Sequence, residues 1–278
     1  MVDPPDAPHF LHQLDLPTAI KLGGFFTATW RLVVAPQADQ IDLLKEHMAV
    51  IKGGEGLTLV RSAADIEGVG RQVLHAEGIY FIETGKDLDL LDWIWEEGFR
   101  SLGPLYNEDN ALGGGGKGDP GRGLTPLGRD LALRAWAKGF LIDSAHMNHK
   151  TQEDLIDLAL ATGNTVHCTH GHLDAPLRPE LGQRGIPREL VRKFFETGGL
   201  LGLKPHPGFL GTFERHLEEI DFLAEIAPDQ VVFGSDFCGM TVPRPDGVRV
   251  FEECKGIWGV PGFAERLAGI HGEDFARG

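Results

Sequence analysis

Metal-ligating and acidic side chains stand at the ends of four short apolar segments. Glu83 follows "IYFI", His146 follows "FLIDSA", His170 follows "TVHCT" and Asp236 follows "VVFGS". Imidazole nitrogens and carboxylate oxygens are ligands that Zn²⁺ accepts in catalytic sites, and three such ligands leave a position open for water. The metal makes that water nucleophilic near neutral pH, and a carboxylate such as Asp236 can orient it or carry its proton. These residues predict a metal-dependent hydrolase.

The segment "TVHCTHGH" (165–172) contains three histidines, of which one is expected to bind the metal. A single strand-end histidine is more often a hydrogen-bonded structural residue, so the argument rests on the whole set. Side chains alternate along a strand, which places His170 on the face of Cys168 and His167 on the opposite face. His170 is therefore the preferred ligand. His167 would lie among the helices, and His172 would be a supporting or surface residue beyond the strand.

The elements that must position these residues alternate between strands and helices. Apolar runs rich in β-branched and aromatic residues predict strands over 24–32, 79–83, 100–105, 139–146, 165–170, 200–205 and 231–236. Helices are predicted over 151–163, with Thr151 as its N-cap and Gly163 as its stop, and over 216–230. This order favours an α/β fold, a TIM-type (β/α)8 barrel with an incomplete or atypical first strand, over a doubly wound open sheet. In such a barrel the strand ends meet at one mouth.

A glycine-rich segment, "GGGGKGDPGRG" (113–123), interrupts this alternation. It lacks both a preceding strand and the GK[ST] ending of a phosphate-binding loop. We expect a mobile polar loop over one face of the protein.

Composition excludes several classes of function. The chain has 278 residues, 42% of them hydrophobic, and a net charge of −15. This charge argues against nucleic-acid or anionic-membrane partners, and no stretch approaches the roughly 20 apolar residues that span a bilayer. Cys168, Cys238 and Cys254 are too widely spaced for a disulfide framework or a cysteine zinc site. We expect a single domain over 1–278, a cytoplasmic location, and a small-molecule substrate, with a homodimer as one assembly to consider.

Several motifs in order resemble those of a known family. "GRGLTPLGRDLALRAWAKGFLIDSAHMNHKT", "TVHCTHGH", "RGIPREL", "GGLLGL" and "VVFGSDFCG" are similar to the renal (membrane) dipeptidase family of zinc metallopeptidases, within the amidohydrolase superfamily, over residues 17–278. The resemblance implies a barrel mouth with two zinc ions bridged by a glutamate. "FIETG" resembles the motif of that glutamate, which would make Glu83 the bridge and His146 and His170 the histidines that complete one metal.

The resemblance also implies roles for residues that bind substrate. Asp236 matches the aspartate placed for proton transfer and amine recognition, and Arg184 matches the arginine that holds the substrate carboxylate. Tyr106 stands where the family commonly has a histidine that polarises the scissile carbonyl. A phenol can still donate to an oxyanion, but this departure leaves ordinary dipeptide specificity open.

A second departure concerns the family's first strand, whose H-x-D pair binds the other zinc. No H-x-D occurs in residues 1–30, and "HFLHQLDLP" (9–17) comes nearest. Two explanations stay open: the chain lacks a segment near its start, or the protein works with one metal.

The prediction is a zinc-dependent hydrolase, with one or two ions, that cleaves the amide bond of dipeptides or similar small carboxylated substrates. The alternatives are another amidohydrolase activity, on a lactone or an acyl-amino acid, and a barrel that has lost catalysis and only binds a ligand.

Overall fold

A curled parallel sheet forms the centre of the protein. The computed structural model describes residues 25–31, 40–42, 44–45, 58–174, 182–206, 210–236 and 256–277. The sheet has the order β1-β3-β4-β5-β6-β7-β8, with β2 also paired to β3, and every pairing is parallel. The strands are β1 (Phe25–Arg31), β2 (Thr58–Leu59), β3 (Arg71–Glu77), β4 (Phe99–Gly103), β5 (Leu141–Asp143), β6 (Val166–Gly171), β7 (Leu201–Leu203) and β8 (Val231–Phe233).

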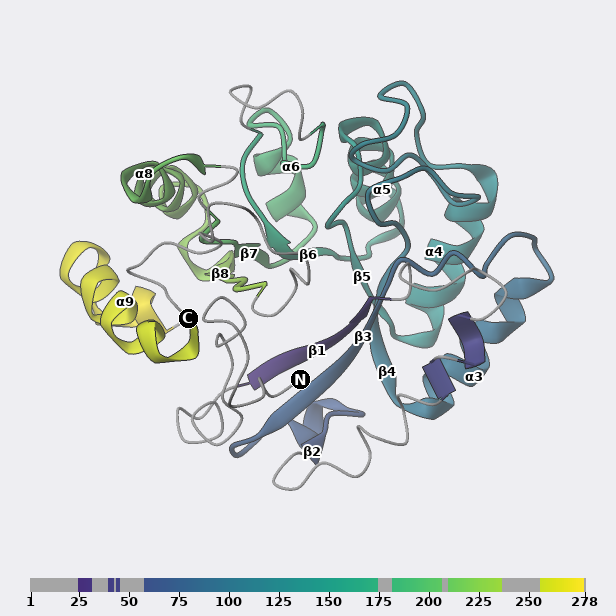
Figure 1. The fold of residues 1–278 in the computed structure, drawn as a ribbon, viewed down its shortest axis with the longest axis horizontal. Helices are drawn as coiled ribbons and strands as arrows, with labels where there is room; N and C mark the ends of the chain where they lie inside the picture. The colour runs from purple at the N-terminus through teal and green to yellow at the C-terminus, as the bar shows by residue number, and fades with distance from the viewer. Residues whose placement is uncertain are drawn as a thin grey trace, which may run out of the picture.

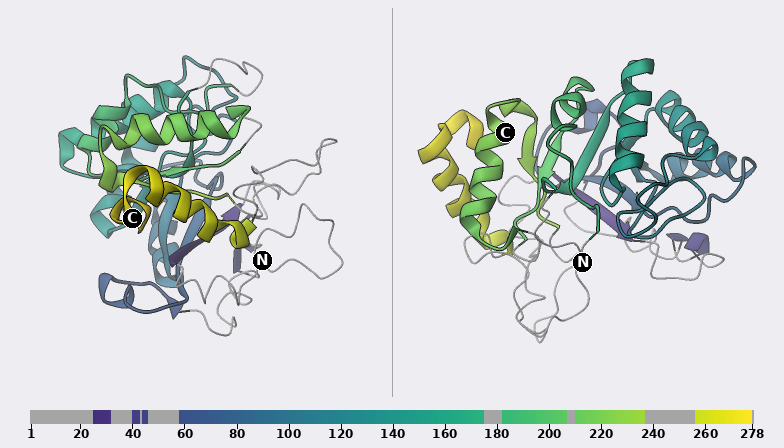
Figure 2. Two further views of the ribbon diagram at one scale, coloured as in Figure 1. Left: turned by 90° about the vertical axis from the view of Figure 1, so that its left-hand side faces the viewer. Right: turned by 90° about the horizontal axis from the view of Figure 1, so that it is seen from above.

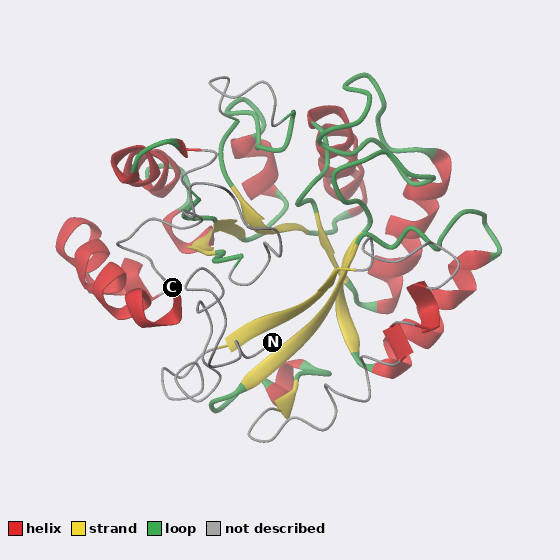
Figure 3. Cartoon of the chain, viewed as in Figure 1, coloured by secondary structure: helices red, strands yellow, loops and turns green. Residues whose placement is uncertain are grey.

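Helices connect consecutive strands and cover the outer face of the sheet (Figures 1 and 2). They are α3 (Leu90–Glu97), α4 (Pro126–Lys138), α5 (His149–Thr162), α6 (Val191–Glu196) and α8 (Phe213–Ala224), with α9 (Gly256–His271) and α10 (Glu273–Arg277) after the last strand. Short 3-10 helices are η4 (Ala63–Asp65), η5 (Asp87–Asp89) and η7 (Pro228–Gln230). Figure 3 shows this arrangement of helices outside strands, which confirms the predicted TIM-type α/β barrel.

The core lies between the strands and this helical layer. Leu74 and Phe99 from the sheet are fully buried, as are Leu131 of α4 and Ile156 of α5. Parallel strands are covered on both faces, which is why β3, β4 and β7 are buried almost throughout. Among the described helices, none combines the length and the apolar character needed to cross a membrane.

The ends of the helices follow local sequence signals. Asn148 caps α5, where its side chain accepts a hydrogen bond from the backbone N–H of Thr151, so the prediction of Thr151 as the cap is wrong. The predicted stop at Gly163 is confirmed, because this residue ends α5 at a φ of 68°. Helix α8 begins after Thr212 and ends at Ala224, so the helix predicted over 216–230 starts earlier and is shorter.

The strand predicted over 79–83 is wrong. The second long strand is β3, which ends at Glu77, and Gly78 turns the chain away with a φ of 75°. Strand β3 was missed in the sequence because it contains the polar residues His75 and Glu77, which interrupt its apolar run. Both are nevertheless buried, like Leu74 and Ala76 between and beside them. The other six predicted strands each overlap an observed one.

The glycine-rich segment is packed at its beginning rather than lying over one face. Residues 113–116 are buried, and only the polar part from Lys117 onward is exposed to any extent. Gly115 forms an isolated antiparallel bridge with Met147, and the Gly114 carbonyl accepts a hydrogen bond from the Asn148 N–H. The prediction of a mobile polar loop is therefore wrong for these glycines.

The segment 9–17, Cys238 and Cys254 lie outside the described residues. The side chains of β1 are likewise not described.

Candidate metal centre

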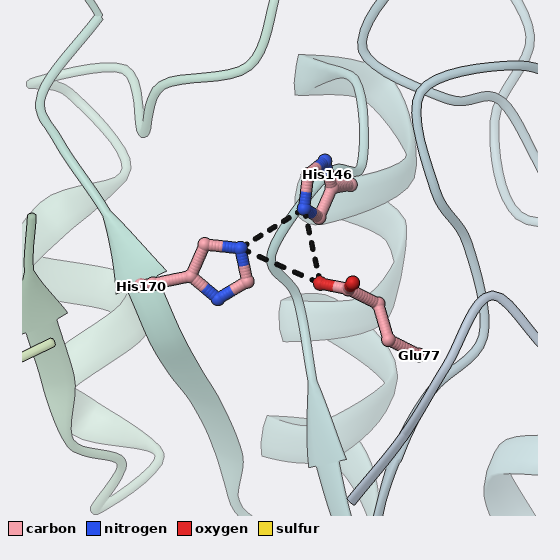
Figure 4. A group of neighbouring side chains, drawn as sticks. All are labelled: Glu77, His146 and His170. Carbon is pink, nitrogen blue, oxygen red and sulfur yellow. Dashed lines mark hydrogen bonds and ion pairs between the residues drawn. The ribbon is translucent and has the colours of Figure 1, made fainter. Parts of the chain in front are cut away.

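Three side chains from three strand ends point toward one another at the mouth of the barrel (Figure 4). Glu77 is the last residue of β3, His146 follows β5, and His170 lies near the end of β6. His146 Nε2 is 2.9 Å from His170 Nε2 and 3.1 Å from Glu77 Oε1, and His170 Nε2 is 3.5 Å from the same oxygen. The structure thus brings two imidazole nitrogens and a carboxylate oxygen together.

The hydrogen bonds of His170 leave its Nε2 free to act as a ligand. Thr169 Oγ1 lies 2.6 Å from Asp143 Oδ2 and 2.9 Å from His170 Nδ1. Burial opposes ionisation of Asp143, but the His75 and His170 rings and the hydrogen bonds from Thr169 hold its pKa below the usual value. The threonine hydroxyl therefore donates to the Asp143 carboxylate and accepts from His170 Nδ1–H. In this tautomer the His170 Nε2 lone pair faces the cluster.

His146 is oriented in a similar way by its other ring nitrogen. His146 Nδ1 is 3.0 Å from Asn107 Oδ1 and 3.3 Å from Arg184 Nη2, both outside the cluster, so the ring turns its Nε2 toward Glu77 and His170. Burial, followed by the nearby Arg184 charge, lowers the pKa of His146 well below its ordinary value. A neutral imidazole is the form that binds metals.

The donor set fits a metal ion. Glu77 Oε1 is buried and accepts no hydrogen bond from the described residues, although it lies among two ring nitrogens. A cation would stabilise two ring nitrogens and a buried carboxylate oxygen that converge in this way, and two histidines with one carboxylate form a known type of catalytic zinc site. Among the described residues this is the one group that offers three such ligand atoms.

The structure does not bring Glu83 to this group, which corrects the prediction for that residue. The Glu83 side chain is exposed in the turn after β3, and its backbone N–H donates to Asp87 Oδ2 at 3.0 Å. Glu77 lies where Glu83 was expected. A signal for Glu77 was present in the sequence, because His75 and Glu77 occupy alternate positions directly before Gly78.

An ion pair between a buried lysine and a half-buried aspartate lies at the ends of the next two strands. Lys204 follows β7, Asp236 follows β8, and Lys204 Nζ is 3.0 Å from Asp236 Oδ2. Burial opposes ionisation of Asp236, but Lys204 and His170 lower its pKa well below the usual range. Sequence reasoning missed Lys204, whose only signal was its place directly after the apolar run "LLGL".

Tyr106 and Arg184 both lie against His146. The Tyr106 ring centroid is 4.2 Å from that of His146, and Arg184 Nη2 is 3.3 Å from His146 Nδ1. The phenol, which follows β4, and the guanidinium thus lie beside His146, one of the three converging side chains.

Strict alternation does not continue to the end of β6. The pairing with β7 shifts between Cys168 and Gly171, so the strand contains an extra residue there. Thr169 was predicted to face away from His170, yet the two side chains are hydrogen-bonded. His167 accepts a hydrogen bond from the Leu200 N–H, and His172 is buried rather than on the surface.

An α/β barrel whose strand ends bring together two histidines and a glutamate has the architecture of a metallohydrolase. Residues 28–253 match the membrane dipeptidase family, peptidase family M19, and the chain belongs to this family.

Individual relatives extend this comparison. The chain is 33% identical over 232 residues to an uncharacterised Klebsiella pneumoniae protein from the pqqA 5′ region, covering 74% of this chain and 82% of that protein. It is 29% identical over 180 residues to an uncharacterised Acinetobacter calcoaceticus protein from the PQQ-III 3′ region, covering 62% of this chain but only 55% of that protein.

Two solved structures share the fold. Dipeptidase AC, a metallopeptidase of family M19, superimposes with a TM-score of 0.75 at 24% identity, covering 95% of this chain and 85% of the other. A Rhodobacter sphaeroides metallopeptidase, bound to a phosphinate mimic of the dipeptide L-Ala-D-Ala, superimposes with a TM-score of 0.72 at 23% identity. This match covers 93% of this chain and 84% of the other.

Proposed function

We propose that this protein hydrolyses the amide bond of dipeptides, or of similar small carboxylated substrates, at a zinc centre held by Glu77, His146 and His170. The observation that carries the proposal is the convergence of these three ligand atoms, all within 4.8 Å of one another. Membership of the membrane dipeptidase family supports the reaction class. The phosphinate dipeptide mimic bound to the Rhodobacter sphaeroides relative supports the substrate class.

A zinc ion would supply an activated water and polarise the scissile carbonyl. Arg184 binds the substrate carboxylate, since a guanidinium can form two parallel hydrogen bonds with it. Tyr106 donates from its phenol to the carbonyl oxygen as negative charge develops there. Asp236 accepts a proton from the attacking water and passes it to the leaving amine.

Lys204 positions Asp236 for this proton transfer. The ammonium occupies Asp236 Oδ2, which leaves Oδ1 to exchange a proton with water and substrate. Because Lys204 is only 4% exposed, its charge is poorly screened by solvent and keeps Asp236 ionised.

The metal assignment can be tested with two glutamates that are close in sequence. Glu77→Gln should weaken zinc binding by at least about tenfold, because loss of even a supporting partner of a ligand costs 10–100-fold. Glu83→Gln is the matched control and should bind zinc like the wild type, since its side chain is exposed and outside the cluster.

Zinc affinity would be measured by competition with a chelator, and metal content by elemental analysis, alongside hydrolysis of a dipeptide panel. Wild-type protein without bound zinc, or Glu77→Gln with unchanged affinity, would refute the site. Zinc binding without hydrolysis of any dipeptide would instead refute the substrate class.

A further inference from the structure

We propose that the glycine-rich segment 113–116 is a backbone clamp that fixes Arg184 against His146, with Gly116 as its positioning residue. This inference rests on the proposed function, in which Arg184 binds the substrate carboxylate. It assigns a role to a segment that neither the metal ligands nor the proton carrier explains.

Hydrogen bonds from one glycine connect the two sides of the site. The Gly116 N–H donates to the His146 carbonyl at 2.7 Å, and the Gly116 carbonyl accepts from the Gln183 N–H at 2.7 Å. Gly116 therefore ties the residue directly before Arg184 to the backbone of His146. The neighbouring bridge between Gly115 and Met147 also holds the glycine-rich segment against the backbone next to His146.

Close packing explains why this position is a glycine. A Cβ on Gly116 would lie 2.4 Å from Arg184 Cγ, 3.2 Å from its Cα and 3.3 Å from its Cβ. Two non-bonded carbon atoms at 2.4 Å overlap sterically, so the Arg184 side chain would have to move. The Arg184 Cα and Cβ atoms are also close enough that the Arg184 backbone would shift as well.

The opposite side of this contact is equally tight. Gly182 has a φ of 72°, and a Cβ on it would lie 2.0 Å from the Gly116 carbonyl oxygen. Two glycines thus allow the chain before Arg184 to approach the segment closely. The Arg184 stem rests on Gly116, which leaves Arg184 Nη2 at 3.3 Å from His146 Nδ1.

The consequence is a fixed distance between the carboxylate-binding guanidinium and the histidine of the metal centre. A substrate whose carboxylate is held by Arg184 must present its amide bond to the metal centre. A displacement of the guanidinium by about 1 Å can therefore cost up to about 10²-fold in activity. Gly116 acts through Arg184 rather than by contact with substrate.

The test is Gly116→Ala, with Gly121→Ala as the matched control in the same loop. A Cβ on Gly121 meets only Asp119 Oδ1, at an ordinary 3.4 Å. Gly116→Ala should raise the KM for dipeptide hydrolysis about tenfold or more while zinc affinity changes less than about twofold, because carboxylate binding is lost and the ligands remain. Gly121→Ala should match the wild type in both.

Arg184→Ala separates this clamp from the proposed function. If Arg184→Ala leaves KM unchanged, the carboxylate assignment of the proposed function is wrong. If Arg184→Ala raises KM but Gly116→Ala does not, the function stands and the clamp is overturned. If Gly116→Ala raises KM further in the Arg184→Ala background, it acts elsewhere, which also overturns the clamp.

A stability cycle covers the case in which Gly116→Ala folds poorly. Truncation of Arg184 to alanine removes Cγ, the atom nearest to the added methyl group. The Gly116→Ala change should therefore lower the melting temperature much less in the Arg184→Ala background than in the wild type. An equal loss in both backgrounds would show that contact with Arg184 is not the reason for the glycine.

Discussion

His146 and Asp236 share an uncommon backbone conformation at the residue scale. They are the two non-glycine residues with positive φ in the described part of the chain, at 67° and 50°. Such conformations cost about 1–3 kcal/mol each and persist where surrounding contacts hold them, often at functional sites. His146 is held by the hydrogen bond from Gly116 to its carbonyl, and Asp236 by the ion pair with Lys204.

Asp236→Asn tests the proton carrier, because asparagine keeps the shape of the side chain and removes its basicity. Turnover should fall by roughly 10²-fold or more while zinc affinity is retained. The measurement is kcat for a dipeptide beside a zinc titration.

The substitution also leaves the Lys204 ammonium buried without its anion, which can cost about 3–5 kcal/mol of stability. The double variant Asp236→Asn/Lys204→Met removes that charge and should recover stability without recovering turnover. If turnover returns with stability, Asp236 is a structural partner of Lys204 and not the proton carrier.

At the scale of secondary-structure elements, the ends of β5 and β6 support the metal centre. Asp143, the last residue of β5, accepts hydrogen bonds from both the N–H and the hydroxyl of Thr169 in β6. Asp143 Oδ2 also lies 3.3 Å from His75 Nε2 on β3. A buried polar chain thus runs across three strands and ends at His170, which it holds in the tautomer suited to metal binding.

Thr169→Val should weaken zinc binding about 10–100-fold, since it removes the hydroxyl that orients His170 and changes the shape of the side chain little. Thr169→Ser retains the hydroxyl and should restore affinity. Competition with a chelator measures both variants, and ¹⁵N NMR of the His170 ring reports its tautomer. Equal zinc affinity of the valine and serine variants would show that the Thr169 hydroxyl does not orient His170 for metal binding.

At the scale of the whole molecule, the outer helical layer carries a buried carboxyl that affects stability. Glu219 of α8 is 6% exposed, and its Oε1 accepts a hydrogen bond from the Leu173 N–H at 3.2 Å. Burial raises the pKa of Glu219 to about 8, from 4.5 in the unfolded chain. Between these values the folded state holds a proton that the unfolded state has lost, so stability falls as pH rises from about 4.5 to 8.

Glu219→Gln should therefore stabilise the protein at pH 8 relative to pH 5, because the amide keeps an acceptor and cannot ionise. Each unit of pKa difference corresponds to about 1.4 kcal/mol, so the gain between these pH values should exceed about 1 kcal/mol. Glu218→Gln is the control, since Glu218 is the adjacent exposed residue. Denaturant unfolding at the two pH values measures both. A pH-independent effect of Glu219→Gln would contradict the raised pKa.

Local sequence patterns were sufficient for the barrel class and for part of the site. Alternation of β-rich apolar runs with helical segments indicated parallel strands, and Gly163 marked the end of α5 because a left-handed residue is needed there. His146 and His170 could be placed at the mouth from sequence because residues that follow parallel strands meet at one edge of the sheet.

Tertiary structure decided which glutamate joins them. Glu77 and Glu83 both follow apolar residues and precede a turn, but only the register of β3 against β4 places Glu77 at the mouth. Lys204 and the packing of Gly116 on Arg184 also depend on segments that are distant in sequence. Neighbouring residues determine whether a segment can form a strand or a helix. Which side chains meet is determined by strand register and close packing, to which residues far apart in the chain contribute together.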